Sequence, residues 1–308
     1  MMMRYAWLSR YPVVFQSVTG LRVGEFDQLV ADVLPLYTEA EQARLTRPDR
    51  QRALGAGHPF ALALRDHVLL TVVWLRVYAT HEVLGYLFGV SDSTVSRLIR
   101  RVLPVLEQAG RDTMRMPDPG RKQRRKLDEL LQDTPELVVV IDTFEQRVQR
   151  PRDREEADKL YSGKKKQHTL KSQVAVDEVS GRVVDVGDSA PGPKADLTLL
   201  AKSKLMARLP EGVGGIGDSA YQGIAQLHPH GLGASPRKKP RGQPRPPEDK
   251  AYNTAFSSRR IIVENTIGRM RRYQSITQTD RNHRQLHTPR VVAIAGLVNR
   301  QIDHRMPV

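Results

Sequence analysis

Three acidic residues occupy positions where a carboxylate could take part in chemistry. Asp142 follows the apolar run 138–141 and Asp218 follows 215–217, so each is predicted to lie at a strand end. Glu264 lies beside apolar residues in a segment with helical spacing. Functional sites gather at strand ends in open α/β sheets. Carboxylate oxygens are the ligands that Mg²⁺ prefers, and two such ions held by three acids can cleave a phosphodiester.

Each acid also has an ordinary structural explanation. An aspartate at the end of a strand commonly caps a turn. A helical glutamate near arginines commonly forms an ion pair, and Arg260 stands four residues before Glu264. No single position therefore establishes a site, and the interpretation depends on the pattern that the three acids form together.

The sequence around these acids resembles bacterial insertion-sequence transposases of the DDE superfamily, which are related to the Harbinger-type elements. Four segments carry the resemblance: Val140–Thr143, Tyr161–His168, Gly217–Gly223 and Ile262–Arg269. The order of the segments agrees with the family, and so does their spacing. The N-terminal half, described below, agrees as well.

The resemblance implies that Asp142, Asp218 and Glu264 are the catalytic residues and hold two Mg²⁺ ions, for which Mn²⁺ could substitute. It also implies a pattern Y-x2-R-x3-E-x6-K around the third acid. Arg260 and Glu264 match this pattern, whereas Arg271 replaces the lysine and Ser257 the tyrosine. Arg260 and Arg271 would then contact DNA, and arginine can bind phosphate in a bidentate manner.

Composition favours a nucleic-acid partner. The chain of 308 residues has 49 lysines and arginines against 34 acidic residues, a formal net charge of +15. The positive charge gathers in three segments, 121–126, 164–166 and 237–245. Of these we predict that Lys164, Lys165 and Lys166 contact DNA. The absence of cysteine excludes disulfides, thiolate zinc sites and cysteine nucleophiles. No apolar run is long enough for a membrane helix, so we predict a cytoplasmic, nucleoid-associated bacterial protein without a membrane partner.

The segment 81–103 has the spacing of a helix-turn-helix. Two short amphipathic helices, 81–88 and about 92–103, are joined across Gly89, which can adopt a positive φ angle. Val83, Leu84, Leu87, Val95 and Leu98 are predicted to face inward. The second helix would then present a polar and basic face to DNA bases and phosphates through Ser93, Thr94, Arg97, Arg100 and Arg101. An ordinary helical hairpin is the alternative.

The hydrophobic pattern predicts an α+β protein in two parts. Residues 1–110 form an all-helical DNA-binding domain, 111–133 a basic linker containing the turn 117–120, and 134–308 an RNase H-like mixed α/β catalytic domain. Within the second part we expect strands at 137–142, 169–176, 181–186 and 214–218. Helices are expected at 196–209 and 259–273, with a loop at 237–250.

Together these features predict a DNA transposase. It would bind the terminal inverted repeats of an insertion sequence, cut there with water, and then use the freed 3′-hydroxyl to attack target DNA. Double-stranded DNA of both kinds is the expected partner, and handling two ends predicts a homodimer or larger assembly. Two alternatives remain open: a catalytically inactive DNA-binding regulator, and a nuclease that cuts without joining strands.

Overall fold

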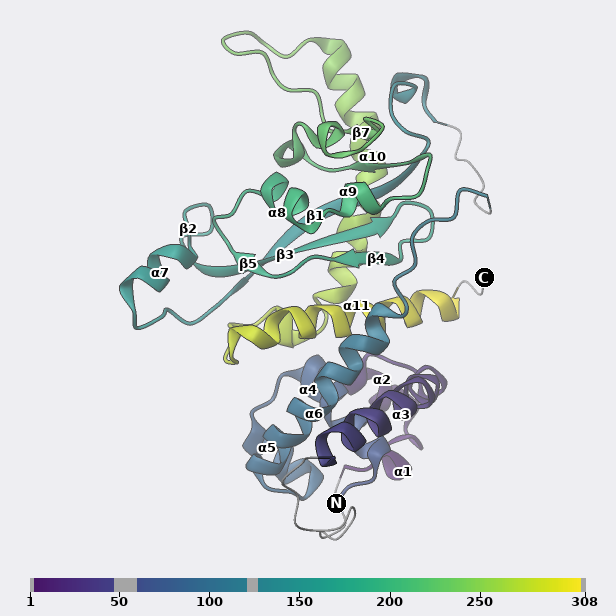
Figure 1. Cartoon of the computed structure of the whole chain (residues 1–308), viewed down its shortest axis with the longest axis vertical. Coiled ribbons are helices and arrows are strands. Elements are labelled where there is room, and N and C mark those ends of the chain that lie inside the picture. Colours follow the sequence, from purple (N-terminus) through teal and green to yellow (C-terminus); the bar gives the residue numbers. More distant parts are fainter. Residues whose placement is uncertain (1–2, 47–59, 121–126, 306–308) are drawn as a thin grey trace.

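The computed structural model describes residues 3–46, 60–120 and 127–305. Within these residues the N-terminal part forms helices joined by turns, as predicted, and packs around the apolar helix α4 (Figure 1). The helices are α1 (Tyr5–Leu8), α2 (Pro12–Thr19), α3 (Val23–Leu45), α4 (Leu64–Val77), α5 (His81–Phe88) and α6 (Asp92–Arg111).

The turn between α5 and α6 is capped as its sequence predicts. Gly89 ends α5 with a φ of 62°, and the Ser91 hydroxyl accepts a hydrogen bond from the backbone N–H of Thr94 at the start of α6. Two expectations were wrong. Val83 is exposed, and α6 continues beyond residue 103 because its second half is buried against a C-terminal helix.

The C-terminal part contains a mixed sheet with β1 (Leu137–Arg147) at its centre. One side of β1 pairs antiparallel with β3 (Gln167–Asp177), which pairs with β4 (Val183–Val186). The other side pairs parallel with β6 (Val213–Ile216), and β6 pairs with β7 (Gly233–Ala234). The short strands β2 (Tyr161–Ser162) and β5 (Ala190–Pro191) extend the edge of β3.

Helices cover the sheet and connect its strands. Three are short: α7 (Arg154–Leu160), α8 (Asp196–Ser203) and α9 (Leu205–Arg208). The long helix α10 (Pro247–Met270) crosses the sheet (Figure 1). The predicted loop at 237–250 was too long, because Pro247 starts α10, with Glu248 and Asp249 in the positive first turn. Single 3₁₀ turns occur at η1 (Glu129–Leu131), η2 (Ser219–Tyr221), η3 (Ile224–Leu227), η4 (Gln274–Ile276) and η5 (Arg284–Leu286).

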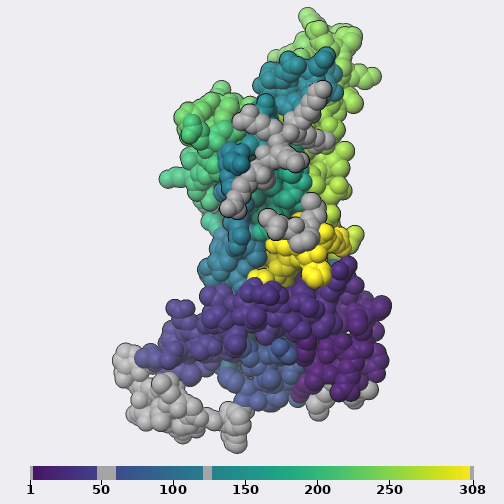
Figure 2. Space-filling view, turned by 90° about the vertical axis from the view of Figure 1, so that its right-hand side faces the viewer, coloured from purple at the N-terminus to yellow at the C-terminus, as the bar shows by residue number. Residues whose placement is uncertain are grey.

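The last helix, α11 (His287–Arg305), lies between the two parts (Figures 1 and 2). It packs against α6 so closely that a Cβ atom on Gly296 would lie 2.4 Å from the Cα of Gly110. One apolar core therefore runs from the N-terminal helices through α11 to one face of the sheet. The α+β class is confirmed. No helix within the described residues is long and apolar enough to cross a membrane.

Candidate active site

The register of the sheet explains how Asp142 and Asp218 meet. Val140 of β1 is the partner of Ile216 of β6 in a parallel ladder. Each acid lies two residues further along its own chain, so both emerge on the same side at adjacent positions. Neighbouring strands lie roughly 4.7–4.9 Å apart. The prediction that Asp142 lies at a strand end is wrong. The strand β1 continues past Asp142 to Arg147, because β3 still pairs with it there.

The electrostatics of Asp142 reflect this crowding. The pKa of its carboxyl group is raised to about 6, chiefly by burial and to a lesser extent by the negative charges of Asp218 and Asp196. The backbone N–H of Thr143, which donates to Asp142 Oδ1 at 2.8 Å, and the Arg260 guanidinium act in the opposite direction. A carboxylate in this position is poorly neutralised by the protein and favours an additional cation.

The structure adds Asp196 to this group, a residue that the sequence did not single out. Asp196 begins α8, and its Oδ1 accepts a hydrogen bond from Lys171 Nζ at 2.7 Å. Lys171 is nearly buried on β3, so it fixes the carboxylate beside the other two aspartates. No local sequence signal predicted this, because the pair joins a strand and a helix start 25 residues apart.

Tyr221 is the second residue that sequence reasoning did not place in the site. Burial raises the pKa of its hydroxyl group, and the charges of Asp196, Asp142 and Asp218 raise it further. Its buried hydroxyl has no hydrogen-bond partner among the residues that the structure describes. A buried polar atom without a partner is costly unless a ligand or water satisfies it.

Glu264 lies on α10, on the far side of Arg260 from Asp142. A buried ion pair fixes this helix against the sheet: Arg259 Nη2 lies 2.7 Å from Glu178 Oε2, and both side chains are almost completely buried. One residue later, Arg260 Nη2 lies 3.7 Å from Asp142 Oδ2 and 3.9 Å from Glu264 Oε1. The guanidinium of Arg260 thus lies between these two acids, and its buried Nε has no partner in the described part of the chain.

These residues fit a divalent metal in part. Asp142 and Asp218 supply hard oxygen ligands where negative charge is concentrated, and the unpartnered Tyr221 hydroxyl lies in the same field. Glu264 does not complete the set as it stands: in the ranges 3–46, 60–120 and 127–305, no three acidic, histidine or cysteine side chains are close enough to share an ion. Because the Glu264 side chain is 60% exposed, it is free to rotate.

The predicted DNA-reading residues of α6 divide into two groups. Ser93, Arg97 and Arg100 are exposed and Thr94 is half-buried on the outer face. Arg101 instead points toward the protein, with its Nε 4.0 Å from Glu41 Oε1 and its guanidinium 5.6 Å from the centre of the Phe60 ring. Its position follows from the helical period, which turns residue 101 toward α3.

The other predicted DNA contacts lie on the catalytic half. Lys164, Lys165 and Lys166 are exposed on the turn between β2 and β3, and Lys166 borders a pocket of about 440 Å³ with Arg147, Arg150 and His168. Arg271 and Ser257 are exposed at the end and on the surface of α10. The basic cluster 121–126 lies outside the described residues.

Comparison with known proteins agrees with this architecture. Residues 60–112 match the model for the helix-turn-helix of DDE superfamily endonuclease. The chain is 28% identical over 288 residues to a probable transposase for insertion sequence element IS702 from Microchaete diplosiphon, covering 94% of each chain. It is 27% identical to a putative transposase for insertion sequence element IS112 from Streptomyces albus G, covering 72% of this chain and 74% of that one.

No solved structure matches the chain. The family assignment comes from the C-terminal part, where residues 141–299 match the model described as DDE superfamily endonuclease. This match spans more than half of the chain and includes all three predicted acids. The protein therefore belongs to the DDE superfamily endonuclease family.

Proposed function

We propose that this protein is an insertion-sequence transposase that binds the terminal inverted repeats of its element, cuts the DNA there and joins the ends to target DNA. The observation that carries the proposal is the side-by-side emergence of Asp142 and Asp218 from parallel strands, in a chain with a helix-turn-helix. Residues 1–110 would read the DNA and residues 134–308 would cut it.

In this proposal Asp142, Asp218 and Glu264 hold two Mg²⁺ ions, or Mn²⁺ in their place. Bound metal would supply charge stabilisation for the attacking and leaving oxygens. Asp196, held in place by Lys171, would add negative charge beside the metal ligands, while Tyr221 would donate its unpartnered hydroxyl to a ligand or water in the site. Arg260, whose Nη2 lies 3.7 Å from Asp142 Oδ2, would offer its guanidinium to a phosphate of the bound DNA.

The function is tested with the protein and labelled duplexes that carry the ends of the encoding element. We expect Mg²⁺-dependent cleavage at the end, followed by covalent joining of the freed 3′-hydroxyl to a second duplex. Cleavage without joining would support the nuclease alternative. Specific binding without cleavage in either Mg²⁺ or Mn²⁺ would support the regulator alternative.

The α6 surface gives a prediction of its own. Arg97→Gln and Arg100→Gln should each weaken binding to the end duplex, because both side chains are exposed on the helix that follows the turn. Removal of a base interaction costs about 1–3 kcal/mol and changes sequence preference, whereas removal of a phosphate interaction lowers the salt dependence by about one unit. Anisotropy titrations over a salt series measure both.

Arg101→Gln is the matched control, since Arg101 lies on the same helix but packs beside Glu41 and Phe60. It should leave affinity near the wild-type value at fixed ionic strength. If Arg101→Gln weakens binding while the other two variants do not, the DNA-reading surface is not the exposed face of α6.

A further inference from the structure

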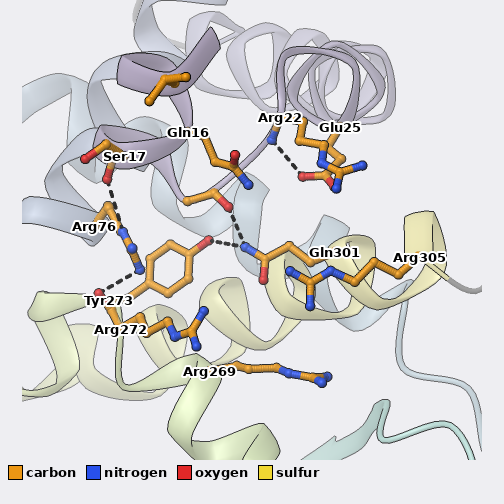
Figure 3. A pocket seen from close by; sticks show the side chains of 12 residues that line it. Gln16, Ser17, Arg22, Glu25, Arg76, Arg269, Arg272, Tyr273, Gln301 and Arg305 are labelled. Atoms are coloured by element: carbon orange, nitrogen blue, oxygen red, sulfur yellow. Dashed lines mark hydrogen bonds between the residues drawn. The ribbon is translucent and has the colours of Figure 1, made fainter.

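An arginine-lined pocket of about 310 Å³ lies where the N-terminal helices meet the ends of α10 and α11 (Figure 3). It shares no lining residue with α6 or with the candidate active site around Asp142 and Asp218, which we call the acidic site. The N-terminal part contributes Arg22 and Arg76, and the C-terminal part contributes Arg269, Arg272 and Arg305. The pocket therefore brings together positive charge from two parts of the chain that are distant in sequence.

The charge in this pocket is poorly balanced. Glu25 is the single acid among the described residues that line it, and its carboxylate accepts a hydrogen bond from the backbone N–H of Arg22 at 2.7 Å. The carboxyl ends of α10 and α11 contribute together roughly one further negative charge. Five guanidinium groups therefore face about two negative charges, which leaves a net positive charge near three.

Three of the arginines also have unused donors. The guanidinium groups of Arg269, Arg272 and Arg305 make no hydrogen bond or ion pair within the described residues, in contrast to Arg76, which donates to the backbone oxygens of Ser17 and Arg272. Burial and the neighbouring charges of Arg305 and Arg272 lower the pKa of Arg269. Mutual repulsion of this kind is relieved when an anion binds.

The lining indicates which anion fits. The arginines supply the free donors, because Gln301 Nε2 already donates to the Gly20 carbonyl oxygen at 2.6 Å and to the Tyr273 hydroxyl oxygen at 3.4 Å. The ring of Tyr273 is buried and Arg76 lies 5.3 Å from its centre, so no free aromatic face is presented for stacking a base. A site made of guanidinium groups without a stacking surface suits phosphate oxygens and not bases.

We propose that this pocket binds the phosphate backbone of double-stranded DNA, independently of sequence and apart from the contacts made by α6. The proposal rests on the proposed function, in which the protein handles element ends and target DNA. A phosphate seated in the pocket would contact both parts of the chain at once.

The test uses the full chain, a mixed-sequence duplex and a chelator, so that neither repeat recognition nor cleavage affects the result. Binding is measured by anisotropy over a salt series for wild type and for Arg269→Gln/Arg272→Gln. We expect the slope of log affinity against log salt to fall by about one unit for each phosphate that the variant no longer neutralises, with affinity about fivefold weaker or more at moderate salt. Arg305→Gln alone, at the exposed end of α11, should give a smaller change in the same direction.

The matched control is Lys202→Gln/Lys204→Gln, which removes two exposed positive charges that line neither the arginine pocket nor the acidic site. If the arginine variant and this control change the slope equally, only net charge matters and the proposal is wrong. Thermal melts with added pyrophosphate distinguish a free oxyanion from DNA. Stabilisation of wild type alone by pyrophosphate, with an unchanged DNA slope, would also overturn the proposal.

Failure of the phosphate-binding proposal is separable from failure of the proposed function. Loss of cleavage in the acidic-site variants would leave the salt slope untouched, because the binding assay contains no free metal. Conversely, if the phosphate-binding proposal alone is wrong, the arginine variants should show an unchanged salt slope and should still cleave and join element ends like wild type. A melt of each variant checks that it is folded before either assay is interpreted.

Discussion

Asp142→Asn should abolish strand cleavage and at the same time make the folded protein more stable. Loss of a metal ligand at a two-metal site removes several kcal/mol of transition-state stabilisation, so we expect cleavage to fall by about 1,000-fold or more. Asparagine keeps the size of the side chain and can still accept the hydrogen bond from the Thr143 N–H. Binding to element ends should remain near wild type.

The gain in stability follows from the raised pKa of Asp142. The folded protein holds its proton up to about pH 6, whereas the unfolded chain releases it near 3.8. The ionised carboxylate therefore destabilises the fold above pH 6, by about 3 kcal/mol at most. Asparagine removes this penalty, and the melting temperature at pH 7 should rise by a few degrees. The difference should shrink as the pH is lowered from 6 toward 4.

Added Mg²⁺ provides an independent measurement of the same carboxylate. It should raise the melting temperature of wild type more than that of Asp142→Asn, because binding to the folded state stabilises it. Asp158→Asn, a change at an exposed acid on α7, should alter neither cleavage nor the response to Mg²⁺. If Asp142→Asn has a lower melting temperature than wild type at pH 7, the protein itself stabilises the ionised Asp142 carboxylate, and the prediction is wrong.

The sequence located Asp142 and Asp218 but could not show how they meet. The apolar runs before them predicted two buried strands, and 76 positions separate the acids. That number equals the offset of the parallel ladder, in which Val140 pairs with Ile216. Pairing partners are set by the whole sheet, so the equality is visible only in the fold. The continuation of β1 to Arg147 was missed for the same reason, since β3 supplies its partners.

Residues that act through distant partners were not predictable. Nothing in the local sequence distinguishes Asp196 from other acids, because its role depends on the contact with Lys171. The same holds for Tyr221, whose buried hydroxyl without a partner is evident only in the folded structure. Arg101 shows the opposite limit. Its charge and helix are those of a DNA contact, but the period of α6 turns it toward Glu41. The sequence predicted which residue types could contact DNA. The direction in which the Arg101 side chain points depends on the packing of α3 against α6, which only the structure shows.

The helix α11 was also missed, although a local signal for it exists. Residues 291–298 are apolar without interruption, which is typical of an element buried on every side. The structure places this run between α6 and the sheet, where all its faces are covered. The position of α11 explains why the two predicted domains share one core and are not joined by a linker alone.

Glu264→Gln provides the sharpest test of the third acid, because its structural explanation and its catalytic one predict different results. In the structure Glu264 is largely exposed and lies 3.9 Å from Arg260, an i,i+4 contact that contributes only about 0.3–0.5 kcal/mol. If Glu264 does no more than this, the variant should melt and cleave like wild type. If it rotates to join Asp142 and Asp218 around metal, the variant should lose most cleavage in Mg²⁺.

The comparison needs a glutamate on the same helix that lies far from the acids. Glu248, exposed in the first turn of α10, meets this condition, so Glu248→Gln should cleave like wild type. We expect the free energy of unfolding of Glu264→Gln to lie within about 0.5 kcal/mol of the wild-type value, and its binding to element ends to be normal. Its cleavage of a labelled end duplex should be at least about 100-fold slower than that of wild type. Partial recovery in Mn²⁺ would indicate a weakened ligand set. Near-wild-type cleavage in Mg²⁺ by the folded variant would remove Glu264 from the site and leave Asp142 and Asp218 as the two candidate metal ligands.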